Sequence, residues 1–176
     1  MKRILMGIAA AATLGPFAAV ATPIAIQNAS FEEPAVSTFT IASPPGWVFA
    51  GFQAGVFRPS SGFFNAGFPT DGVQSGYANV GSSLTQDGVA TIFDGVTYTL
   101  LVDVGRRKDR CCTTLSFEIS LLADGVSVAS VDETDFVGGP PDPGDWKSIS
   151  LSLVGDATLD GRSLGIELFA FENQTN

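Results

Sequence analysis

The sequence predicts an all-β protein, a sandwich of about nine or ten strands. Short stretches in which apolar and polar residues alternate recur along the chain, and turn-forming residues separate them. The chain holds 20 Gly and 10 Pro in 176 residues, which suits frequent turns. No segment carries the 3.6-residue apolar period of an amphipathic helix, so we expect no substantial helix.

The longest apolar run outside the N-terminus covers residues 97–107, with the sequence TYTLLVDVGRR. One face of an extended strand here carries Tyr98, Leu100, Val102 and Val104, and the other face is mixed. We expect this run to be the central strand of a sheet. The charged cluster Arg106 to Arg110 follows it, and its expected role is a solvated loop paired with nearby acids.

The remaining strands and loops follow from the same alternation. A short strand begins at Ile24 and is stopped by Pro34. Further strands are expected at residues 47–57, 75–80, 83–86, 89–93, 115–122, 126–131, 146–153 and 164–168, with long loops at 36–45, 58–72 and 132–145. The Asp124–Gly125 pair predicts a tight hairpin turn between two of these strands.

Residues 1–21 have the pattern of a signal peptide. Lys2 and Arg3 precede an apolar stretch, and Ala19 to Ala21 ends it with small residues that a signal peptidase accepts. A membrane anchor is the alternative, but Gly7, Gly15 and Pro16 interrupt a short apolar centre. We expect cleavage after Ala21, a β-sandwich domain over residues 22–176, and a secreted or cell-surface protein.

Charge and composition restrict the function. The chain has 9 basic and 18 acidic residues, and loss of Lys2 and Arg3 leaves 9 − 2 = 7 basic residues and a net charge of −11. Nucleic acid and anionic lipid are therefore poor partners. There is no histidine, and no G-x-S-x-G, P-loop or zinc-protease motif, so the sequence predicts no enzyme.

A series of motifs resembles a known family. The series IQNASFEEP, GW, PTDGVQSGYANVGSSLTQ, GVTYTLLVDVGRR, PGDWKSISLSL and LGIELFAFEN, over most of residues 24–176, resembles an exported bacterial family of the PEP-CTERM type. This resemblance implies a galactose-binding-like jelly roll similar to carbohydrate-binding modules. It further implies one structural calcium ion, held by Glu32 and by backbone carbonyls near Asn28 and Ala29. A solvated carboxylate is the alternative for Glu32.

The chain departs from that family at its C-terminus. The family's last strand, roughly Phe-Asp-Asn-Val, and its sorting tail have no counterpart after residues 171–176, so we expect a truncated domain. The strand beside the missing one, with Leu164, Ile166 and Leu168, would then present an open edge. The expected consequence is self-association.

The expected ligand site combines two loops. Phe63, Phe64 and Asn65 in the first long loop would join Trp146, next to the second, as an aromatic and amide surface for a sugar. In the alternative, these phenylalanines plug one end of the core. The predicted function is a non-catalytic extracellular module that binds polysaccharide or an envelope or matrix component. A structural or adhesive surface protein and a small glycan-active enzyme with paired carboxylates are the alternatives.

Cys111 and Cys112 are adjacent, so an ordinary relaxed disulfide between them is excluded in a strand. A strained vicinal bridge, an intermolecular bridge and two free thiols remain open.

Overall fold

The computed structural model describes residues 21–109 and 116–171, and within them it contains ten strands and no helix. The strands are β1 Phe39–Thr40, β2 Val48–Ala50, β3 Ala54–Phe57, β4 Ser75–Ala78, β5 Ser82–Thr91, β6 Thr97–Gly105, β7 Phe117–Ala123, β8 Val126–Asp132, β9 Trp146–Val154 and β10 Ser163–Ala170. The predicted signal peptide up to residue 20 and the Cys111–Cys112 pair lie outside the described residues. No helix in the described part is long and apolar enough to span a membrane.

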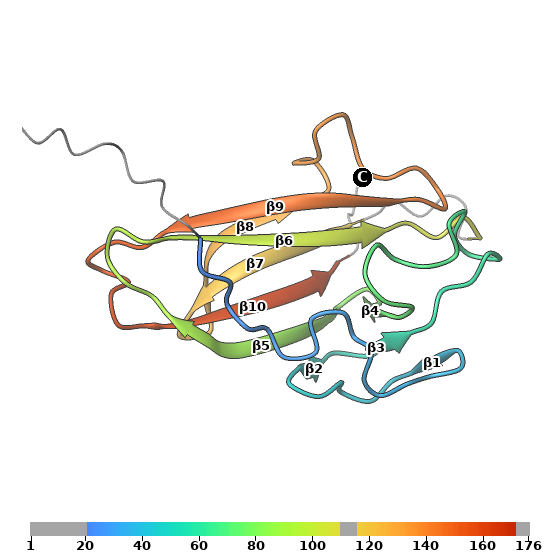
Figure 1. The fold of residues 1–176 in the computed structure, drawn as a ribbon, viewed down its shortest axis with the longest axis horizontal. Helices are drawn as coiled ribbons and strands as arrows, with labels where there is room; N and C mark the ends of the chain where they lie inside the picture. The colour runs from blue at the N-terminus through green and yellow to red at the C-terminus, as the bar shows by residue number, and fades with distance from the viewer. Residues whose placement is uncertain (1–20, 110–115, 172–176) are drawn as a thin grey trace, which may run out of the picture.

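The strands form a two-layered, jelly-roll-like sandwich (Figure 1), so the predicted fold class is confirmed. One layer is a five-stranded sheet in the order β2-β5-β10-β7-β8. The other layer has two parts, the three-stranded sheet β1-β3-β4 and the pair β6-β9, and no pairing joins them in the described chain. We call the first the continuous layer and the second the divided layer.

The core lies between the layers and follows the predicted alternation. In β6 the predicted inward residues Tyr98 and Leu100 are buried, whereas Leu101 on the opposite face is 69% exposed. In β9, Ile149, Leu151 and Leu153 are buried against the same core. Burial of apolar side chains contributes about 25 cal/mol per Å² removed from water, so this interface is the main stabilising term.

Two predictions about strand position are wrong. Among the described strands β6 pairs only with β9, so residues 97–107 do not form a central strand. The strand with Leu164, Ile166 and Leu168 is not an open edge, because β10 pairs with β5 on one side and β7 on the other. Alternation reveals which face of a strand is buried, but neighbours within a sheet are set by long-range pairing.

The two strands predicted at 83–86 and 89–93 are one strand, β5. The register with β10 shifts between Leu164 and Ile166, opposite the Asp87–Gly88 pair, and Gly88 adopts a positive φ of 71°. Between the pairs Leu164–Ala90 and Ile166–Gln86, β5 has two more residues than β10, and a bulge accommodates such extra residues without ending the strand. The turn residues therefore indicated an irregularity rather than a loop.

The strand predicted at Ile24 is absent, because side chains take the place of a backbone ladder. The Gln86 side-chain amide accepts from the Gln27 amide at 2.9 Å and donates to the Gln27 carbonyl at 3.0 Å. A turn closed by the bond from the Phe31 amide to the Asn28 carbonyl follows directly. These contacts hold the N-terminal segment on the sandwich without extending it.

Gln74 holds the next part of this segment from a buried position. Its side chain accepts from the Val36 amide at 2.6 Å and donates to the carbonyls of Phe31 at 2.9 Å and Pro34 at 3.2 Å. Burial of a side-chain amide costs free energy unless its donors and its acceptor form hydrogen bonds. All three of these groups depend on Gln74.

We therefore expect Gln74→Ala to lower the free energy of unfolding by about 2–4 kcal/mol, because it leaves several buried backbone groups unpaired. Urea unfolding of the purified domain measures this. Gln53→Ala is the matched control, since the Gln53 side chain bonds only to other side chains, Asn79 at an exposed site and the Tyr77 phenol, and leaves no backbone group unpaired when removed. Equal effects of the two substitutions would contradict the assigned role of Gln74.

Candidate functional site

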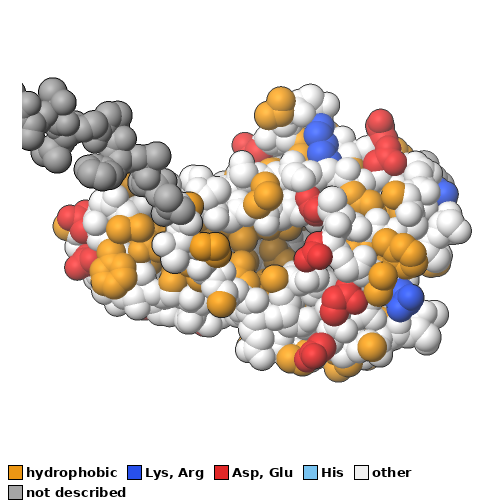
Figure 2. Space-filling view, in the orientation of Figure 1, with side chains coloured by type: hydrophobic (Ala, Val, Ile, Leu, Met, Phe, Trp, Pro, Cys, Tyr) orange, Lys and Arg blue, Asp and Glu red, His pale blue; other side chains and the backbone are white. Residues whose placement is uncertain are grey.

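A cavity of about 780 Å³ lies between the layers where the divided layer is open. Figure 2 shows it as a hollow in the face of the molecule, with apolar side chains on its floor and acidic side chains on one side. Its walls come from β4 and β6, and its floor comes from β5, β7 and β10 of the continuous layer. A volume of this size is in the range of small-molecule sites.

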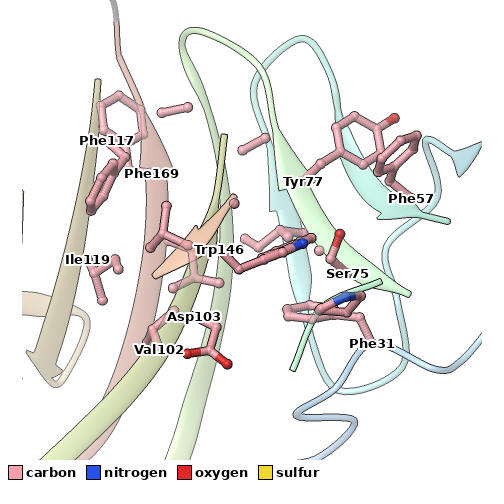
Figure 3. A pocket seen from close by; sticks show the side chains of 18 of the residues that line it. Phe31, Phe57, Ser75, Tyr77, Val102, Asp103, Phe117, Ile119, Trp146 and Phe169 are labelled. Carbon is pink, nitrogen blue, oxygen red and sulfur yellow. The ribbon is translucent and has the colours of Figure 1, made fainter. Parts of the chain in front are cut away.

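Aromatic rings dominate the walls, and they are arranged in contacting pairs. Phe31 and Trp47 have ring centroids 4.9 Å apart, and Phe64 and Trp146 are stacked with centroids 4.5 Å apart. Figure 3 shows Trp146 in the middle of the cavity, with Phe117 and Phe169 on the side of the continuous layer. Such walls favour a planar, largely apolar guest.

Gly105 at the end of β6 makes the Phe64–Trp146 stack possible. A Cβ atom at this position would lie 2.6 Å from Trp146 Cζ3 and 2.8 Å from a ring carbon of Phe64. Any side chain here would therefore overlap both rings. The absence of a side chain allows the stack to lie directly on the backbone.

The two long loops meet beside this stack, as the sequence analysis expected. The Asn65 amide donates to the Gly144 carbonyl at 2.8 Å, and Asn65 Nδ2 donates to Asp145 Oδ1 at 2.9 Å. These bonds fix Phe64 on one loop relative to Trp146 on the other. Asn65 is therefore a loop anchor and does not line the cavity.

Asp103 is the carboxylate that the fold holds most firmly at the cavity. It lies on β6, and it accepts hydrogen bonds from the hydroxyls of Thr70 and Ser148. Two other acids line the cavity, Asp71 and Glu118; the first is exposed, and the second accepts a bond from Ser120. Figure 3 shows Asp103 next to Val102, on the same side of the view as the β6 ribbon.

Two further polar groups are placed to contact a guest. The Trp146 Nε1 group is buried and has no hydrogen-bond partner within the described chain. Tyr77 on β4 also lines the cavity; burial raises the pKa of its phenol, and a hydrogen bond with Gln53 opposes this. The phenol therefore stays protonated at neutral pH, and its hydroxyl donates to the Thr40 carbonyl at 3.2 Å.

Arg107 closes one end of the cavity through its contacts with aromatic rings. Its guanidinium lies 4.4 Å from the ring centroid of Phe63 and 5.3 Å from that of Phe57, and it forms an ion pair with Asp109 at 2.6 Å. This arrangement is a cation–π cluster. The charged segment that follows β6 is thus partly a cavity wall, in addition to carrying the expected ion pair.

The structure places some of the predicted ligand residues in the cavity lining and others outside it. Phe64 and Trp146 line the cavity, and Phe64 is only 3% exposed. Phe63 packs against Phe57 and Arg107 and does not line the cavity. The assignment of Phe63, Phe64, Asn65 and Trp146 to ligand binding stays a prediction.

The residues predicted to hold calcium make other contacts here. Glu32 Oε1 accepts from the amides of Val73 and Gln74 at 2.7 and 2.9 Å, and the Asn28 side chain bonds to the backbone of Glu33. In the part of the chain described, no three side chains of Asp, Glu, Cys or His are grouped so that they could hold a metal ion. The two bonds that Glu32 accepts anchor the loop at Val73 and Gln74. Calcium binding by Asn28, Ala29 and Glu32 stays a prediction.

The cavity also holds residues that the sequence did not single out as site residues, among them Phe31, Trp47, Tyr77 and Asp103. Asp103 carried a signal, because it is the one charged residue inside the apolar strand Thr97–Gly105. The aromatic residues carried none, since an isolated ring in a loop or on a short strand is more often part of the core.

Comparison with known proteins identifies the family. The HpiC1-like family, described as HpiC1 cyclase, matches residues 22–176. The chain belongs to the HpiC1-like cyclase family. No curated protein sequence matches it.

Solved structures of cyclases have the same fold as this HpiC1-like chain. An apo cyclase from Fischerella sp. is 26% identical with a TM-score of 0.68, over 82% of this chain and 85% of that one. A Stig cyclase from Fischerella sp. TAU in complex with (3Z)-3-(1-methyl-2-pyrrolidinylidene)-3H-indole is 24% identical with a TM-score of 0.69, over 82% and 86%. Another cyclase from Fischerella sp. TAU, bound to 4-(1H-indol-3-yl)butan-2-one, is 24% identical with a TM-score of 0.70, over 84% and 87%.

These findings correct the functional predictions. The chain belongs to a cyclase family, so the predictions of a PEP-CTERM-type carbohydrate module, of a non-catalytic function and of no enzyme are wrong. The predicted polysaccharide or envelope partner is also wrong, because the solved neighbours bind small indole compounds. The absence of histidine does not exclude an enzyme of this kind, since ring closure within one molecule requires neither a histidine base nor a zinc ion.

For this HpiC1-like chain we expect Gly105→Ala to separate the Phe64–Trp146 stack and to cost about 1–3 kcal/mol, because overpacking forces neighbouring groups to move. Thermal unfolding measures the loss of stability. Near-ultraviolet circular dichroism, which reports the packing of the tryptophans, measures the change in the stack. Gly62→Ala is the matched control, since a Cβ there meets only Ser60 at 3.5 Å. An unchanged tryptophan spectrum in Gly105→Ala would refute the close approach.

Proposed function

We propose that this chain is a cyclase that binds a small, planar, largely apolar substrate of the indole type and closes a ring within it. The observation that supports this proposal is a cavity with paired aromatic walls and one firmly held carboxylate, in a chain of the HpiC1-like cyclase family. The indole compounds bound by the solved neighbours suggest the substrate class.

The aromatic walls act on the conformation of the substrate. A flexible side chain on an indole must fold over the ring before a bond can form, and this ordering costs entropy. Phe31 with Trp47 and Phe64 with Trp146 would hold the planar part, so that the side chain folds against the apolar floor. Their π faces also stabilise positive charge that develops in the transition state.

Asp103 supplies a negative charge and the group that accepts a proton. A proton from solvent adds to one carbon of the side-chain double bond and leaves positive charge on the other carbon. The electron-rich ring then forms the new carbon–carbon bond to that cationic carbon, and a proton leaves the ring carbon, so that the product is an isomer of the substrate. The Asp103 carboxylate stabilises that charge and accepts the proton, which afterwards passes to solvent. The Thr70 and Ser148 hydroxyls keep the carboxylate in one orientation.

The first test concerns binding and uses the two tryptophans of the chain, both of which line the cavity. The probe 4-(1H-indol-3-yl)butan-2-one should shift the indole N–H resonance of Trp146, whose Nε1 group has no hydrogen-bond partner among the described residues. The Trp47 resonance should move less, because Trp47 donates to the Gln27 carbonyl at 3.1 Å. Nitrogen–proton correlation spectra with Trp47→Phe and Trp146→Phe assign the two signals, and two unmoved signals at millimolar probe would refute the site.

The second test concerns catalysis. Asp103→Asn should lower kcat for cyclisation of indoles with an unsaturated side chain by about 10²–10⁴-fold, the usual contribution of a positioned proton-transfer group. Product formation is followed by chromatography and mass spectrometry. Asp94→Asn is the control, since Asp94 is exposed and lies outside the cavity. Retained activity in a folded Asp103→Asn variant would assign the chemistry to another group.

A further inference from the structure

Arg106, directly after β6, lines the cavity as a cation that has no partner in the described chain. We infer that Arg106 is an anion subsite of the cavity, and that the substrate carries a carboxylate at the end of the side chain on its indole-type ring. This inference rests on the proposed function and narrows its substrate class. The role of Asp103 is unchanged by it.

Backbone hydrogen bonds fix the position of Arg106. Its amide donates to the Asp145 carbonyl at 3.0 Å, and its carbonyl accepts from the Gly144 amide at 2.6 Å. These bonds continue the pairing of β6 with β9 beyond Gly105. Side chains two residues apart share a face of a strand, so Arg106 follows Val104, which packs against the core. Arg106 thus lies at the end of the inward row of β6.

The charge of Arg106 is partly removed from water and is not compensated. Its side chain is partly buried, and its Nε atom is buried without a hydrogen-bond partner among the described residues. The one ion pair within residues 21–109 and 116–171 joins Arg107 to Asp109, so no described carboxylate pairs with Arg106. Removal of a charged group from water costs free energy unless the group is paired. The cavity therefore holds an uncompensated positive charge at this point.

Arg107, the next residue, has its contacts supplied by the protein. Its guanidinium lies 2.6 Å from an oxygen of Asp109 and 4.4 Å from the ring centroid of Phe63. The two adjacent arginines thus differ in their surroundings. Arg107 is part of the cavity wall, whereas Arg106 keeps its capacity to bind an anion.

A carboxylate is the group that best matches these unpaired donors. The N–H groups of a guanidinium form a fork that fits the two oxygens of a carboxylate, and such charge-assisted bonds are short and strong. Trp146 Nε1 and Ser116 Oγ are the other buried side-chain atoms without a partner in the described chain, and both residues line the same cavity. All three side chains can donate, and an ionised carboxylate only accepts.

The acidic residues of the lining limit the charge of the guest. Asp71, Asp103 and Glu118 line the same cavity, and the chain has a formal net charge of −9. A doubly charged phosphate would meet more repulsion here than a single carboxylate. Without Arg106 this field would disfavour any anion. A preference for an acid is therefore a direct test of Arg106.

The inferred subsite is separate from the position of Asp103. The two residues are three positions apart, which is about 10 Å along an extended strand. Alternation places Asp103 on the other face of β6, where it accepts from Ser148. Trp146 pairs with Gly105, between the two positions. A guest whose ring lies against Trp146 can therefore present its reacting atoms to Asp103 and its acidic end to Arg106.

The test compares two probes of the same length. The first, 4-(1H-indol-3-yl)butan-2-one, ends in a methyl ketone. The second, 3-(1H-indol-3-yl)propanoic acid, has a carboxylate oxygen in place of that methyl group. Calorimetry at about pH 7.5, where the acid is ionised, measures the Kd of each probe for the full chain. We expect the acid to bind at least about tenfold more tightly than the ketone.

Arg106→Gln should reverse this order, because it removes the cation and leaves the carboxylates of the lining, while the Kd of the ketone stays unchanged. Arg106→Lys keeps the charge without the fork and should retain only part of the preference. Arg162→Gln is the matched control, since it removes the same charge from an exposed site outside the cavity. Melting temperatures check that each variant is folded.

An acid preference that Arg106→Gln reverses and Arg162→Gln preserves supports the inference. Binding of the ketone with an equal or weaker Kd for the acid overturns the inference and leaves the proposed cyclase standing. An acid preference that survives in Arg106→Gln also overturns it, because another group then binds the carboxylate. If neither probe binds at millimolar concentration, the inference fails together with the proposed function.

Discussion

The pairing of β10 between β5 and β7 is the interaction on which the rest of the structure depends. It places Leu164 and Ile166 at the centre of the one continuous sheet, where both are almost fully buried. The divided layer packs on this sheet in two separate parts, and neither part is paired to the other in the described chain. The cavity lies where the two parts of the divided layer leave the continuous layer uncovered.

The sequence predicted those aspects of the fold that depend on local alternation. The class, most strands and the inward faces of Thr97–Gly105 and Trp146–Val154 follow from a two-residue period, which each strand carries within itself. The strand neighbours do not follow from it. Leu164 and Ile166 have the same alternation in an edge strand or an inner one, and only pairing with residues 40 to 80 positions away decides between them.

The site was only partly predictable for a similar reason. Phe64 and Trp146 could be selected as large aromatic rings near irregular loops, and the contact between these loops brings them together. Trp47 and Tyr77 belong to the same cavity only because the divided layer is open, and no local pattern indicates an opening. Asp103 was visible as a charge in an apolar strand, but its partners Thr70 and Ser148 lie far from it in sequence.

The independence of the β6–β9 pair has a mechanical consequence. In the described chain this pair is attached to the continuous layer through side chains such as Leu100, Ile149 and Leu151, while its ladder of backbone bonds is internal. Packed side chains tolerate small sliding movements more readily than a hydrogen-bonded ladder tolerates a change of register. The pair can thus slide by small amounts on the continuous layer, and it pivots at the end where the bonds from the Asn65 amide to the Gly144 carbonyl and from the Lys108 amide to the Phe63 carbonyl tie it to the loop between β3 and β4.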